Sequence, residues 1–255
     1  MTLLADTWFR VLPASSTARA RLICLPPAGA GIATFASWRE FAPPWLELCL
    51  AQLPGREVRI AEPPAPDVDA LVDGLAAAVG ELTASDALPY AVFGHSMGGL
   101  LAYELAGRLE AGRGRAPAHV FVSASAVPGP GADELVASGL ADPEAFLRRL
   151  GGTMAEVWEY PDLVELVTAA LRADLTLLRD HRLGAHAIAA PLALLYGNDD
   201  PVAGPADVSW WRSRARGPLS VARFAGGHFY LTDDPAPVLA AVVRHLDQPA
   251  HPGSG

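Results

Sequence analysis

A serine bracketed by glycines is the clearest candidate nucleophile in this chain. The stretch Gly94-His95-Ser96-Met97-Gly98 fits the pattern G-x-S-x-G, in which a strand turns sharply into a helix and the serine hydroxyl sits at the corner. Residues 90–93 form a short apolar run typical of a buried parallel strand, and residues 100–109 have amphipathic helical spacing. This context favours a nucleophile elbow over an ordinary glycine-rich turn, which would instead suit a phosphate at the helix N-terminus.

A serine of this kind needs a base and an orienting carboxylate, which follow it in the chain order Ser, Asp/Glu, His. His228 is the best base among the seven histidines, because it directly follows a strand-like run and two glycines. Asp200 is the preferred carboxylate, since it follows a strand-like run and precedes a proline that restricts its backbone. Its neighbour Asp199 is the alternative. His95 is rejected as the base, because adjacent side chains diverge at a sharp turn.

These residue types together predict nucleophilic acyl chemistry. His228 would take the proton of Ser96 during attack, and Asp200 would hold the imidazole tautomer and stabilise the imidazolium. The oxyanion that forms needs two N–H donors. We expect one from the backbone of Met97 and the second from the loop Pro26-Pro27-Ala28-Gly29, where Ala28 is preferred and Gly29 is the alternative.

Apolar strand-like runs alternate with helical patterns along nearly all of the 255 residues. Strands are expected at residues 21–25, 46–53, 90–93, 118–123, 191–196 and 219–224, and helices at 67–82, 100–109 and 238–246. This alternation predicts one α/β domain, 1–255, with a mostly parallel sheet covered on both faces. Sites in such sheets lie beyond the carboxyl ends of the strands.

One segment, from about 128 to 189, breaks the alternation, because it holds only helical patterns. A helical insertion after a core strand predicts a lid over the site. Two of its histidines are candidates for substrate contact: His181 and His186. Carboxylates of this segment and of the last loop are interpreted as solvated or capping groups: Asp174, Asp233 and Asp234. His119 is interpreted as a packed or edge histidine of a strand, and the tail 248–255 is expected to be disordered.

Composition excludes several function classes. The net charge of −9 argues against a general nucleic-acid binder. The sequence has no stretch of eighteen or more apolar residues, so no membrane span is predicted. No signal peptide is evident, and Cys24 and Cys49 lie in apolar runs where buried free thiols are expected, so a cytoplasmic location follows. The sequence has no lysine for a Walker-type loop and no metal-ligand pattern, so no cofactor is predicted.

Six motifs occur in a specific order: CLPPAGAG, LPGRE, GHSMGG, RADL, YGNDDP and FAGGHFYL. Together they resemble the stand-alone type II thioesterases of polyketide synthase and non-ribosomal peptide synthetase pathways, over about residues 22–246. The resemblance implies an α/β-hydrolase fold with a helical lid and a triad of Ser96, Asp200 and His228. It also implies hydrolysis of aberrant or stalled acyl groups from the phosphopantetheine arm of acyl or peptidyl carrier proteins. Many members carry histidine or phenylalanine where this chain has Pro27, which bears on the second oxyanion donor.

Two other functions remain open at this point. An esterase, lipase or peptidase would use the same fold and triad, because these do not specify the acyl donor. A non-enzymatic binding protein is disfavoured by the intact triad. Residues that would line the substrate channel, or else pack in the core, are Met97, Met154, Trp158, Leu163 and Leu171. Arginines that would dock a carrier protein, or else face solvent, are Arg56, Arg59, Arg148 and Arg149.

Overall fold

Seven strands form one sheet in the order β1-β3-β2-β4-β5-β6-β7 in the computed structural model, which describes residues 4–84, 86–112, 114–152 and 155–247. The strands are β1 (Phe9–Leu12), β2 (Ala20–Leu25), β3 (Leu46–Ala51), β4 (Tyr90–His95), β5 (His119–Ser123), β6 (Leu192–Gly197) and β7 (Leu219–Phe224). All neighbouring pairs are parallel except β1 with β3. The carboxyl ends of β2 to β7 therefore meet at one edge of the sheet, where the candidate residues follow four of them.

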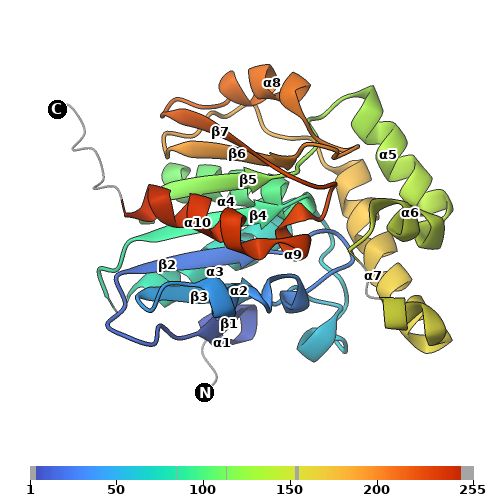
Figure 1. The fold of residues 1–255 in the computed structure, drawn as a ribbon, viewed down its shortest axis with the longest axis horizontal. Helices are drawn as coiled ribbons and strands as arrows, with labels where there is room; N and C mark the ends of the chain where they lie inside the picture. The colour runs from blue at the N-terminus through green and yellow to red at the C-terminus, as the bar shows by residue number, and fades with distance from the viewer. Residues whose placement is uncertain (1–3, 85, 113, 153–154, 248–255) are drawn as a thin grey trace.

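Helices cover both faces of the sheet (Figure 1). One face packs against α3 (Val68–Ala84) and α4 (Met97–Ala111), with α1 (Leu4–Trp8) beside α3 and α8 (Val208–Arg212) near the β7 edge. The other face packs against α2 (Trp38–Phe41), α9 (Tyr230–Asp233) and α10 (Pro235–Leu246). The described residues also form four short 3-10 helices: η1 (Ile32–Phe35), η2 (Glu57–Arg59), η3 (Ala155–Glu159) and η4 (Pro205–Asp207). The apolar strand residues are buried between these two layers, which confirms the predicted α/β sandwich.

Three helices, α5 (Pro130–Ala141), α6 (Pro143–Leu150) and α7 (Pro161–Asp180), are inserted between the adjacent strands β5 and β6. Figure 1 shows them gathered at one end of the sheet. Each begins with proline, which suits the first helical position because its missing N–H has no helical partner there. Asp142 separates α5 from α6, since its side chain accepts the Ala145 N–H at 3.0 Å and caps α6. We call these three helices the helical insertion.

The strands predicted from apolar runs are all present, with bounds that differ by at most a few residues. The sequence prediction missed β1, α1, α2, α8 and α9, because elements of four or five residues are too short to show a hydrophobic period. Both cysteines are buried and free, as expected. The predicted disordered tail, 248–255, lies outside the described residues.

Candidate active site

Ser96 lies at a strained corner between β4 and α4, with φ 54° and ψ −117°. Few residues with a side chain adopt such angles, and they cluster at functional sites. Glycines make the corner possible: a Cβ on Gly94 would lie 1.8 Å from the Gly98 carbonyl oxygen, and one on Gly98 would lie 2.1 Å from the Leu25 carbonyl oxygen. The Ser96 N–H donates to the Ser123 carbonyl at 2.7 Å and ties the corner to β5. This is the geometry of the predicted nucleophile elbow.

His228 and Asp200 form a buried hydrogen-bonded pair beyond the ends of β7 and β6. His228 Nδ1 lies 3.0 Å from Asp200 Oδ1 and 3.2 Å from Oδ2, and the two side chains are 1% and 0% exposed. Asp200 is itself oriented by Val202, whose N–H donates to Oδ1 at 2.8 Å. The alternative carboxylate, Asp199, is exposed, and its N–H donates to the Gly226 carbonyl at 3.0 Å. That hydrogen bond joins the loop after β6 to the loop after β7.

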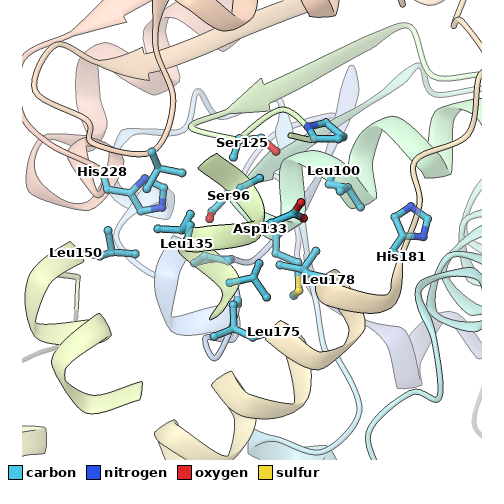
Figure 2. A pocket seen from close by; sticks show the side chains of 18 of the residues that line it. Ser96, Leu100, Ser125, Asp133, Leu135, Leu150, Leu175, Leu178, His181 and His228 are labelled. Atoms are coloured by element: carbon cyan, nitrogen blue, oxygen red, sulfur yellow. The ribbon is translucent and has the colours of Figure 1, made fainter. Parts of the chain in front are cut away.

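Ser96 and His228 share the wall of one cavity of about 420 Å³, which lies between the sheet edge and the helical insertion. Figure 2 shows the Ser96 hydroxyl and the His228 ring at this cavity, opposite leucines of the insertion. Ala28 and Met97 also line it. Its apolar wall is made mostly by the insertion: Leu135, Val136, Phe146, Leu147, Leu150, Leu175 and Leu178. The cavity therefore offers an apolar chamber next to the serine.

The channel residues predicted from sequence have different places. Met97 lines the cavity as expected. Leu171 is buried in the core of the insertion, against which Trp158 also packs, and Leu163 is exposed. Met154 lies outside the described residues. The prediction was wrong for Leu163, because a helical period does not tell which apolar face meets a cavity.

The loop after β2 makes a tight turn beside Ser96. The Ala30 N–H donates to the Pro27 carbonyl at 3.2 Å, and Gly29, with φ 75°, takes the left-handed conformation that a type II turn requires at its third residue. The Gly29 N–H donates to Asp174 Oδ2 at 2.8 Å. Because Gly29 is occupied in this way, Ala28 is the better candidate for the second oxyanion donor. Met97 is the first residue of α4, where N–H groups have no helical acceptor.

Three other histidines of the described residues, at or near the site, have structural partners. His95 is fully buried, its Nδ1 lies 2.8 Å from Ser123 Oγ, and burial, followed by repulsion from His228, lowers the pKa of its imidazole well below its usual range. His181 lines the cavity, with its Nε2 3.2 Å from Glu104 Oε1. His186 instead stacks on Tyr103, with ring centroids 4.9 Å apart.

Three charged residues expected at the surface are buried. Asp174 forms a bidentate ion pair with Arg56. Arg59 binds Glu62 and the Gln52 carbonyl and stacks over Trp8. The interpretation of Asp174 as a solvated or capping group was therefore wrong, as was surface exposure for Arg56 and Arg59. The other arginines and carboxylates for which the sequence predicted surface exposure are exposed: Arg148, Arg149, Asp233 and Asp234.

The chain matches the family model described as the thioesterase domain over residues 20–248. It is 34% identical to the thioesterase PikA5 of Streptomyces venezuelae over 244 residues, covering 94% of this chain and 85% of that protein. The chain belongs to the thioesterase family. Its mostly parallel seven-stranded sheet flanked by helices is that of the α/β-hydrolase fold expected from the sequence.

Two further relatives place this thioesterase in context. It is 36% identical over 242 residues to the antimetabolite synthetase AmbE of Pseudomonas aeruginosa, but these cover 94% of this chain and only 11% of that synthetase. The structure of BorB, the type II thioesterase from the borrelidin biosynthetic cluster, superposes with a TM-score of 0.75 at 32% identity, covering 94% of this chain and 98% of that one.

The described ranges, 4–84, 86–112, 114–152 and 155–247, hold neither a metal-site arrangement nor a membrane-spanning helix. No group of three or more histidine, cysteine, aspartate or glutamate side chains there has the arrangement of a metal site. No helix in these ranges is long and apolar enough to cross a membrane.

Proposed function

We propose that this thioesterase hydrolyses acyl groups from the phosphopantetheine arm of acyl or peptidyl carrier proteins, and so removes aberrant or stalled units during polyketide or non-ribosomal peptide synthesis. The observation that carries the proposal is the buried Asp200–His228 pair on the same cavity as the strained Ser96. The relation to PikA5 and to the type II thioesterase BorB supports the carrier-bound substrate.

In the proposed reaction, Ser96 Oγ attacks the thioester carbonyl while His228 Nε2 takes the hydroxyl proton. Asp200, bound to Nδ1, keeps the second proton of the imidazolium in place. The negative charge on the carbonyl oxygen is bound by the N–H groups of Met97 and Ala28. The thiol of the arm then leaves with the proton from His228. Water, deprotonated by His228, releases the acid from Ser96, so no cofactor is needed.

The shape of the site suits a substrate with two arms. A second cavity, of about 750 Å³, lies next to the first and shares Ala28, Leu147 and Phe229 with its wall. It is lined by the turn after β2, by η2 and by the first half of α7, and it opens beside Ile60 and Leu166. Two neighbouring cavities beside the nucleophile give room for an acyl group and for a long flexible arm. We assign the helical insertion as the lid that covers both.

A cytoplasmic location is part of the proposal. Its support is the pair of buried free cysteines, since oxidising compartments favour disulfides.

The test is hydrolysis of acetyl-, propionyl- and longer acyl-carrier proteins by wild type and by Ser96→Ala. The same acyl groups on N-acetylcysteamine and on p-nitrophenol serve as controls, because they separate the contribution of the carrier from that of the thioester. We expect kcat/KM to be far higher on the carrier than on either small substrate, and Ser96→Ala to abolish turnover. Faster cleavage of the p-nitrophenyl esters would favour an esterase of the same fold. Retained activity in Ser96→Ala would refute the elbow.

A further inference from the structure

A buried ion pair joins the helical insertion to the loop after β3. Arg56 Nη1 and Nη2 each lie 2.6 Å from an oxygen of Asp174, which is 118 residues away in the C-terminal half of α7. The two residues are 7% and 2% exposed. Removing two charges from water is costly, and a hydrophobic pair of similar volume is often at least as stable. A contribution to folding stability is therefore a weak explanation for this buried pair. The other hydrogen bonds of Arg56 and Asp174 indicate a different role.

Both members of the pair also bind the turn that carries the proposed oxyanion donor. Asp174 Oδ2 accepts the Gly29 N–H at 2.8 Å, and Arg56 Nη1 donates to the Ala30 carbonyl at 3.1 Å. Two consecutive residues of the turn are thus held by one ion pair. The helix approaches as closely as the backbone allows, since a Cβ on Gly29 would lie 2.9 Å from Leu171 Cβ.

These contacts fix the direction of the Ala28 N–H. In a trans peptide the carbonyl and the following N–H point in opposite directions. The Pro27 carbonyl points into the turn, where it accepts the Ala30 N–H at 3.2 Å, so the Ala28 N–H points out of the turn. Glycine populates several backbone regions readily, and Gly29 therefore does not hold this turn by itself. The acceptor on α7 selects the conformation with φ 75°.

We propose that Asp174 and Arg56 are positioning residues, which hold the turn so that the Ala28 N–H is preorganised for the oxyanion. The inference rests on the proposed function only in needing a tetrahedral intermediate on Ser96. It makes the helical insertion part of the catalytic apparatus, because α7 supplies the carboxylate that orders the turn.

The first variant is Asp174→Leu, which removes the acceptor of the Gly29 N–H together with the partner of Arg56, whereas an asparagine oxygen would keep the Gly29 contact. Loss of one oxyanion donor lowers kcat by about 10²–10³, and we expect a fall of this size with KM nearly unchanged. A trifluoromethyl ketone, which forms an adduct with Ser96 resembling the tetrahedral intermediate, should lose affinity by a similar factor. The matching unreactive thioether should bind as well as it does to wild type. Asp86→Leu is the matched control, since it breaks the bidentate pair with Arg21 away from the site.

Asp174→Leu leaves the Arg56 charge buried without its partner, and such a loss is by itself strongly destabilising. The double variant Arg56→Met/Asp174→Leu removes both charges and keeps an apolar volume. We expect it to regain thermal stability while kcat stays low, because the Gly29 N–H still lacks its acceptor and the Ala30 carbonyl has also lost its donor. If the pair served stability alone, kcat would recover together with thermal stability in the double variant.

The measurements use p-nitrophenyl acetate and the ketone, so they do not depend on a carrier protein. If wild type cleaves this ester but no acyl carrier, the proposed function fails while the present inference is still tested. Wild-type kcat per folded molecule in the double variant would overturn the inference. Equal losses of affinity for the ketone and the thioether would also overturn it, because the pair would then shape binding and not the oxyanion site.

Discussion

Replacing Asp200 with asparagine isolates the role of the carboxylate from its shape. Asp200 Oδ1 accepts the Val202 N–H at 2.8 Å, so the asparagine oxygen stays at that position. The amide NH₂ then takes the place of Oδ2, 3.2 Å from His228 Nδ1. The oxygen at the Oδ1 position remains 3.0 Å from Nδ1. The NH₂ group is a donor that competes with it for that nitrogen and favours the tautomer with the proton on Nε2, the nitrogen that must accept the proton of Ser96. The neutral amide also stabilises the imidazolium less than the carboxylate does.

The wrong tautomer lowers kcat by about 10⁴ in a serine protease with the same arrangement, and we expect a similar loss here. A factor of 10⁴ corresponds to about 5.4 kcal/mol of transition-state stabilisation. The assay is kcat on an acyl carrier and on p-nitrophenyl acetate, with circular dichroism and Tm to show that the variant is folded. Asp199→Asn is the control, because that exposed neighbour carries the same change and should keep wild-type kcat. A loss below tenfold in Asp200→Asn, or an equal loss in Asp199→Asn, would refute the assignment.

Two further predictions concern stability. Gly98→Ala puts a Cβ 2.1 Å from the Leu25 carbonyl oxygen, and it should lower the free energy of urea unfolding by about 1–3 kcal/mol or more. Gly80→Ala meets open space on α3 and should raise that free energy by about 0.5–1 kcal/mol. Equal effects of the two variants would contradict the close approach at the elbow. Burial, followed by repulsion from His245, lowers the pKa of His119 to about 4. The unfolded chain therefore binds this proton first, near pH 6.5, and the stability from neutral His119 is complete above that pH and is lost as the pH falls toward 4. Wild type should lose about 2 kcal/mol from this group between pH 7.5 and 5, and His119→Phe should lose correspondingly less; identical pH dependence in the two proteins would show that His119 is not the cause.

Local sequence was sufficient for the parts of the site that follow strands. Ser96, Asp200 and His228 each come directly after an apolar run, and parallel strands bring their carboxyl ends to one edge. Glycine and proline beside these residues restrict the turns in ways that a short motif records. The elbow and the His228–Asp200 contact could therefore be predicted without knowing how the helices pack.

Contacts between distant segments could not be predicted in this way. Arg56 and Asp174 are far apart in sequence, and each alone has the pattern of an exposed charge. Only the packing of α7 against the turn after β2 brings them together, and no single-segment period encodes that packing. The choice between Ala28 and Gly29 was open for the same reason, because the acceptor that occupies Gly29 comes from α7.

The ion pair also divides α7 into two unequal arms. On the short arm Leu175 and Leu177 are buried, whereas on the long arm Leu163 and Leu166 are exposed. At a rise of 1.5 Å per residue, the start of the helix lies about 20 Å from Asp174. A tilt of about 10° around the pair would move that end by about 3 Å and leave Gly29 nearly still. Such a tilt would widen the mouth near Leu166 while the turn beside Ser96 kept its geometry.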